Sequence, residues 1–289
     1  MALGAERCRK GAGKPVARPD GQSRPAAGSF KPRSEMQIPT MNMKRAHLIA
    51  AALIGSSLVL GRPAAAADAP TVDSILARHL EAVGGKEAMQ KVHSRLIQVR
   101  IESESIGNGE GEIYAKAPDR QRSHIELGGL GAVDEGFDGT VAWAKSAMEG
   151  VRVKTGDELA KVRREAQFNP ELKLKSLYPD LAYKGMEKVG DEDAWVLESR
   201  PSATSKERFW FSAKTVLLVR IESEYEGPQG VINANLFPGD YKVFDGLKLP
   251  CAMKLKTSSG GQGLEFTIKF LSVKHNVEVD DSKFAKPAE

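Results

Sequence analysis

Residues 96–102 read LIQVRIE, and apolar and polar residues alternate along this segment. Ile97, Val99 and Ile101 fall on one side of an extended chain, because successive side chains of a β-strand point to opposite faces. The segment therefore predicts a strand with one buried and one solvated face. A Gly-Asn-Gly turn follows at residues 107–109, and we expect the chain to return there as the second strand of a hairpin.

Similar short apolar segments recur along the rest of the chain, each bounded by turn residues. We expect further strands at 110–116, 120–127, 140–145, 182–189, 193–199, 208–212, 216–222, 231–242, 249–257 and 264–273. The sequence thus predicts about ten or eleven strands. Successive strands joined by short turns form an antiparallel meander, and a long meander curls because its strands twist.

Two helical regions accompany these strands. From the capping residue Thr71 to Val83, apolar residues recur at helical spacing, and a short helix is expected to follow. A second helical region covers residues 156–178, in the middle of the strands. We predict an α+β fold in which the helices cover the concave side of the sheet. His79, on the apolar face of the first helix, is predicted to be a core residue.

The N-terminal part of the chain has the features of an export signal. Met43-Lys44-Arg45 is a positively charged start, residues 46–61 are almost wholly apolar, and Ala64–Ala67 supply the small residues of a cleavage site. We predict a signal peptide over residues 41–67 and a single periplasmic domain over residues 68–289. The alternative is that the apolar run forms a buried helix of the domain. No Cys follows the run, so no lipid anchor is expected.

Residues 1–40 are rich in Gly, Pro, Arg, Lys and Ala and lack apolar periodicity, a composition that cannot bury a core. We interpret them as a disordered leader or as the product of an overcalled start codon, with translation beginning at Met41 or Met43. N-terminal sequencing of the precursor checks this. A precursor peptide from upstream of Met36 would contradict a later start.

The basic character of the whole chain belongs to this leader. The chain has 42 basic and 38 acidic residues, and residues 1–67 hold 11 and 3 of them. Subtraction leaves 31 basic and 35 acidic residues, a net charge of −4 for the expected mature domain. A mildly acidic surface of mixed sign offers no electrostatic footprint for nucleic acid or an anionic membrane.

The residues of the expected mature domain show no pattern typical of catalysis or metal binding. Its histidines are isolated, and it has neither a nucleophile elbow nor a phosphate-binding loop. Cys251 is its single cysteine, which excludes an intrachain disulfide and favours a buried thiol. We therefore expect a protein that is not an enzyme and has no cofactor. A hydrolase with a dispersed site is the alternative ranked lowest.

Several short sequence segments, taken in order along the mature chain, resemble the LolA-like family of outer-membrane lipoprotein-sorting proteins. They are Ile75–Ala88, Phe137–Trp143, Arg164–Phe168, Phe209–Phe211, Thr215–Arg220 and Tyr241–Pro250. The resemblance implies an incomplete, half-open antiparallel β-barrel that is lined with apolar residues and covered by helices. It also implies a non-enzymatic periplasmic carrier whose cavity shields the acyl chains of lipoproteins.

The resemblance, together with the large apolar residues of the predicted strands, gives a set of candidate ligand-binding residues. The cavity candidates are Phe209, Phe211, Leu217, Val219, Phe266, Ile268 and Phe270, with Trp143, Phe168 and Trp195 as lid or rim groups. The expected partner is a lipid or an acylated lipoprotein, with an envelope protein as a further partner. The alternative interpretation is an envelope interaction module whose interior is packed and holds no lipid.

Overall fold

The structure, a computed structural model, describes residues 6–7, 69–228 and 230–288. All of these residues belong to one compact unit. Except for Glu6 and Arg7, the expected leader and signal peptide lie outside the described residues. Within the described ranges, no helix has the length and apolar character needed to cross a membrane.

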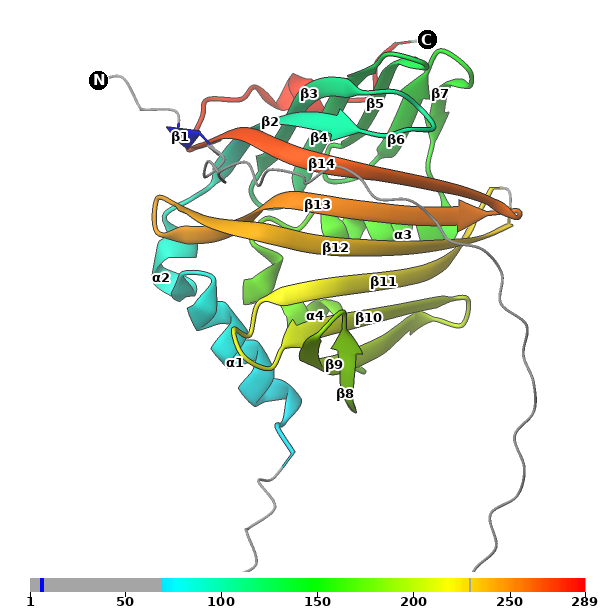
Figure 1. Cartoon of the computed structure of the whole chain (residues 1–289). Helices are drawn as coiled ribbons and strands as arrows, with labels where there is room; N and C mark the ends of the chain where they lie inside the picture. The colour runs from blue at the N-terminus through cyan, green and yellow to red at the C-terminus, as the bar shows by residue number, and fades with distance from the viewer. Residues whose placement is uncertain (1–5, 8–68, 229, 289) are drawn as a thin grey trace, which may run out of the picture. The chain divides into compact units, whose positions relative to one another are not determined.

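The order of elements in the described residues is strand-rich, with helices at the start and in the middle (Figure 1). The strands are β1 (Glu6–Arg7), β2 (Ser94–Glu102), β3 (Gly109–Lys116), β4 (Arg120–Leu127), β5 (Gly131–Phe137), β6 (Ala142–Ser146), β7 (Gly150–Val153), β8 (Ala182–Val189), β9 (Glu192–Ser202), β10 (Ser205–Ser212), β11 (Leu218–Gly227), β12 (Gly230–Phe244), β13 (Leu247–Ser259) and β14 (Gln262–His275). The helices are α1 (Val72–Ala82), α2 (Gly85–Gln90), α3 (Gly156–Glu165), α4 (Leu174–Leu177) and the 3₁₀ turns η1 (Pro170–Leu172) and η2 (Asp281–Phe284).

The sheet follows the order β7-β6-β5-β4-β3-β2-β14-β13-β12-β11-β10-β9-β8, and β1 pairs with β14 beside this path. Neighbouring strands of this path are consecutive in the sequence except β2 and β14, which pair with each other. The edges of the path are β7 and β8, so the sheet is open and not closed into a barrel. The predicted antiparallel meander is confirmed. The predicted strand number was too low, because the described path contains thirteen strands.

Within the thirteen-strand path, the two strands that the sequence did not predict are β5 and β7. The sequence of β5, GAVDEGF, has few residues with high strand propensity, and β7 is only four residues long. Packing explains the glycine at position 136. A Cβ atom there would lie 2.4 Å from the ring of Trp143, so only glycine lets the indole rest on the strand. Tertiary contact of this kind, not local propensity, makes β5 a strand.

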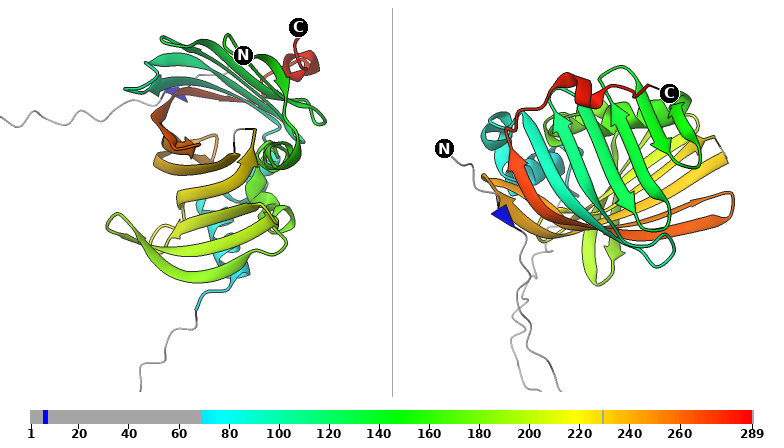
Figure 2. Two further views of the ribbon diagram at one scale, coloured as in Figure 1. Left: turned by 90° about the vertical axis from the view of Figure 1, so that its right-hand side faces the viewer. Right: turned by 90° about the horizontal axis from the view of Figure 1, so that it is seen from above.

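The sheet curves so that its two halves approach each other on the concave side. Figure 2 shows α3 between the strands β3–β7 (green) and the strands β11 and β12 (yellow), and α3 contacts both β6 and β11. Helices α1 and α4 pack over β9 and β10 on the same side. The prediction that the helices cover the concave side is therefore confirmed. We call this side of the sheet the cavity face and the other side the opposite face.

Helix α1 begins where the sequence predicts, and its residue His79 contacts a strained turn between β10 and β11. Thr71 caps the helix by accepting a hydrogen bond from the Ser74 backbone N–H at 3.1 Å. His79 is buried, as predicted, and its Nδ1 lies 2.8 Å from the carbonyl oxygen of Val216. Val216 has a φ of +60°, a conformation that a β-branched residue adopts only under constraint. The histidine therefore fixes the turn between β10 and β11.

We expect the burial of His79 to make the protein less stable in mild acid. Burial lowers the pKa of His79, and the bond to Val216 and the charge of Glu171 offset this only in part. The unfolded chain takes up its proton near pH 6.5, so below this pH it binds more protons than the folded chain and the free energy of unfolding falls. Stability is restored above about pH 6.5.

Urea unfolding of the protein and of His79→Gln, at about pH 7 and about pH 5.5, checks this expectation. Glutamine keeps a hydrogen-bond donor but does not titrate, so the variant should show a weaker loss of stability in acid. An identical loss in both proteins would show that His79 does not contribute.

Candidate functional site

A cavity of about 400 Å³ lies on the cavity face, between the two halves of the sheet and next to α3. We call it the α3 cavity. One wall comes from β4 and β5, the facing wall from β11, β12 and β13, and the third from α3 and from Lys154, which follows β7. Its lining residues are Gln121, Ser123, Glu135, Gly136, Phe137, Lys154, Glu158, Lys161, Val162, Glu165, Ile221, Ser223, Tyr225, Ala234, Leu236, Leu255 and Thr257.

The wall formed by β11, β12 and β13 is largely apolar, because strand register aligns its aliphatic side chains. Ile221 is directly opposite Leu236, and Leu236 is directly opposite Leu255, so the three form one row across three strands. Directly opposed residues share a face of the sheet and lie within contact distance. Phe137 on β5 and Val162 on α3 complete the apolar lining. This part of the cavity suits a hydrocarbon group.

The side near the start of α3 is polar, and its charges are paired. Arg152 binds Glu158 through two hydrogen bonds of 2.7 and 2.8 Å. The ammonium group of Lys154 lies 3.1 Å from a carboxylate oxygen of Glu135 and 3.9 Å from one of Glu158. Burial alone raises the pKa of Glu158, but Arg152 and Lys154 outweigh this and lower it. Glu158 is therefore a carboxylate at neutral pH.

A second group of charges connects α3 to the strands β10 and β11. The side chain of Glu207 is 4% exposed, and it lies 3.7 Å from the Lys161 ammonium and 3.6 Å from the Arg164 guanidinium. Ser223 donates to Glu207 at 2.6 Å and accepts from Lys161 at 3.1 Å. Glu165 also pairs with Lys161. Burial alone lowers the pKa of Lys161, but the two carboxylates outweigh it and raise this pKa, so the lysine stays charged.

The other side of α3 is attached to β5 and β6 by apolar contacts. Leu159, Val162 and Ala166 pack against Phe137 and Ala142. The helix therefore bridges the two halves of the sheet, with ion pairs on the β10–β11 side and hydrocarbon contacts on the β5–β6 side. Because of these two attachments, α3 forms a fixed roof over the cavity.

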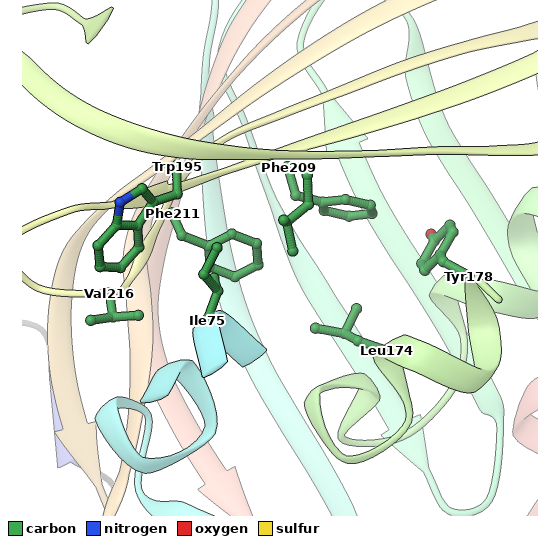
Figure 3. Close-up of a cluster of buried hydrophobic side chains, with 8 residues drawn as sticks. Ile75, Leu174, Tyr178, Trp195, Phe209, Phe211 and Val216 are labelled. Atoms are coloured by element: carbon green, nitrogen blue, oxygen red, sulfur yellow. The ribbon is translucent and has the colours of Figure 1, made fainter. Parts of the chain in front are cut away.

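Within the described residues, none of the ten residues proposed from the sequence lines the α3 cavity. Phe209, Phe211 and Trp195 lie in a packed cluster between β9, β10, α1 and α4, shown in Figure 3 together with Ile75 and Tyr178. The rings of Phe209 and Tyr178 meet edge to face, with centroids 5.0 Å apart. These residues fill the interior instead of leaving space for a ligand.

The other proposed residues are distributed over separate regions. Leu217 and Phe168 belong to a cluster around α2. Ile268 and Phe270 pack around Val99, and Phe266 is directly opposite Leu255 on β13. Two residues lie elsewhere. Val219 packs against Trp210, and Trp143 lies beneath the C-terminal turn η2, where its Nε1 donates to the carbonyl oxygen of Phe284 at 2.9 Å.

Alternation along residues 216–222 and 249–257 also places Ile221 and Leu255 on inward faces of their strands, but neither is among the ten residues proposed from the sequence. Those ten also leave out the polar residues, although the sequence carries a signal for one of them. Glu207 is in phase with Phe209 and Phe211, so the alternation places a carboxylate on a buried face. A charge at such a position needs buried partners. In the part of the chain that the structure describes, no group of three or more side chains could hold a metal ion.

No protein-family model and no curated protein matches the chain. Among solved structures, a DUF1329 family protein from Desulfovibrio piger is 14% identical over 75% of this chain and 98% of its own length, with a TM-score of 0.47. A LolA superfamily protein from Nitrosomonas europaea is 16% identical over 75% of this chain and 99% of its own, with a TM-score of 0.46. The chain is similar in structure to a LolA superfamily protein, from the family that its sequence resembles.

Proposed function

We propose that the protein is a non-enzymatic binding or carrier protein of the periplasm that holds the acyl chain of a lipid or of an acylated cargo in the α3 cavity. The observation that carries this proposal is the cavity itself, with its aliphatic row on one wall and paired charges on another. Its volume of about 400 Å³ lies in the range of small-molecule pockets. The signal peptide expected from the sequence supports the location.

An amphiphile, which has an apolar chain and a polar head group, matches the apolar wall and the charged side of the α3 cavity. The row of Ile221, Leu236 and Leu255 can bury methylene groups, each of which contributes about 0.8 kcal/mol when removed from water. The charged groups near the start of α3 can remain hydrated beside a polar head group. A carrier is the simplest use of such a site, because an acyl chain needs shelter from water during transfer between membranes.

The alternative function, a packed interaction module without a ligand, is favoured by one specific observation. The aromatic residues that the sequence marked as cavity candidates lie mainly in packed clusters. The two interpretations differ in what they predict for the α3 cavity, which a packed module would not use.

Filling the cavity from β12 should strongly weaken ligand binding. Ala234 lines the cavity, so the ring in Ala234→Phe should lower the affinity for an acyl ligand by about tenfold or more, since it displaces at least two methylene groups. The measurement is calorimetric titration with lauroyl lysophosphatidylcholine below its micelle concentration. The matched control is Asn233→Phe, because the adjacent residue is exposed and points to the opposite face.

Binding by the unmodified protein and by Asn233→Phe that is strongly weakened in Ala234→Phe supports the proposal. Absence of binding to the unmodified protein, or equal affinity in all three proteins, would remove the basis for a carrier and favour the packed module.

A further inference from the structure

The interior of the curved sheet is divided, and only one part of it is hollow. On the β8–β10 side, α1 and α4 close over a cluster that contains Leu197 and Phe211, which are 0% and 1% exposed. On the β2–β14 side, Val99 and Phe270 lie in another packed cluster. The α3 cavity lies between these packed regions. It cannot extend into either of them without displacing close-packed side chains.

The roof of the cavity is also held in place. Besides the ion pairs of Lys161, the start of α3 is tied to the hairpin between β9 and β10, where Asp157 accepts a hydrogen bond from Ser202 at 3.2 Å and another from Thr204. Its far end packs on Phe137 through Ala166. Contacts at both ends and along both sides hold this roof in place, so a hydrocarbon group that exceeds the cavity must extend through its open side into water.

The volume corresponds to one hydrocarbon chain. A methylene group takes up roughly the volume of a water molecule in the liquid, about 30 Å³. Dividing about 400 Å³ by this volume gives about 13 methylene groups. A cargo with two or three long chains would need two or three times this space.

A head group has a place next to the chain. A groove of about 510 Å³ shares Glu158 with the α3 cavity and is lined by Arg152, Asp157, Thr204 and Glu226 among others. Its side chains carry charges of both signs and hydroxyl groups. The groove has one arginine and three carboxylates, so it favours a head group with an ammonium group over an anionic one, and Arg152 can meet the phosphate of a zwitterionic head group.

We propose, building on the acyl-binding function above, that the site is selective for an amphiphile with one acyl chain and a zwitterionic head group. The chain lies along the row of Ile221, Leu236 and Leu255, and the head group lies in the groove beside Glu158. Lipids with two chains and triacylated cargo are excluded because the second chain finds no room.

Two phosphocholines that share a head group test this selectivity. Lauroyl lysophosphatidylcholine has one twelve-carbon chain, and didecanoyl phosphatidylcholine has two ten-carbon chains, whose twenty carbons exceed the roughly 13 that the cavity can hold. In calorimetric titrations below their micelle concentrations, we expect one lysolipid per protein and an affinity for the two-chain lipid weaker by roughly a hundredfold or more. Equal affinity for the two lipids, or two lysolipids bound per protein, would overturn the proposal.

The same titrations separate this inference from the proposed function. If both lipids bind and Ala234→Phe strongly weakens both, the cavity is an acyl site without chain selectivity, and only the inference fails. If neither binds, the proposed function fails as well. In a series of lysolipids, affinity should rise about fourfold per methylene up to about 13 carbons and then level off. A continued rise through longer chains would also contradict the single-chain limit.

Discussion

Replacement of Glu207 by alanine is expected to lower the free energy of unfolding by about 3–5 kcal/mol. The carboxylate is almost completely buried, and it is the shared partner of Lys161 and Arg164 on α3 and of Ser223 on β11. Without it, two cations remain near the interior with an uncompensated charge. The loss should appear in urea unfolding as a lower midpoint, and lysolipid affinity should fall as well, because α3 loses its attachment to β10.

Glu165→Ala provides the matched control for this prediction. Glu165 pairs with the same lysine, but its side chain is 53% exposed, so its contribution should be below about 1 kcal/mol. If the two alanine variants lose the same stability, then burial does not set the strength of these ion pairs, and the role assigned to Glu207 is wrong.

Phe211→Ala is expected to cost about 3–5 kcal/mol of stability while leaving lysolipid affinity unchanged. The ring is 1% exposed and packs in the cluster with Ile75, and it meets the imidazole of His79 edge to face at 5.0 Å. Its removal leaves a void inside the packed cluster, and the ring itself does not line the α3 cavity. Thermal or urea unfolding measures the first effect, and calorimetric titration measures the second.

Leu236→Ala should show the opposite pattern. Leu236 is only partly buried and lines the α3 cavity, so truncation should cost less stability than Phe211→Ala but weaken lysolipid binding. A loss of affinity in Phe211→Ala that matches the loss in Leu236→Ala would place the ligand in the aromatic cluster, as the sequence first suggested.

The contrast between Phe211, which the sequence proposed as a ligand contact, and Leu236, which lines the cavity, shows what the sequence could and could not predict. Alternation in segments such as residues 96–102 predicts strands because burial of one face is a local property of the pattern. Helix α1 was predicted for a similar reason, through its cap at Thr71 and its apolar periodicity. The pairing of β2 with β14 is a contact between the two ends of the domain, which no local pattern encodes.

The site was harder to predict than the fold. Large aromatic residues such as Phe209 and Phe211 were natural candidates, but large side chains fill space, so they mark the packed parts of an interior. The α3 cavity lies instead where smaller residues such as Ala234 and Ser223 face inward. Its roof depends on a helix that is separated in sequence from every strand of the apolar wall, and this juxtaposition exists only in the folded chain.

Methyl NMR of the protein during titration with lauroyl lysophosphatidylcholine tests most directly whether the α3 cavity is the ligand site. We predict that the methyl signals of Ile221, Leu236 and Leu255 shift and saturate with one lysolipid per protein, while those of the buried residues Ile75 and Leu197 stay in place. Shifts confined to Ile75 and Leu197, or to exposed methyl groups such as those of Val243, would contradict the account.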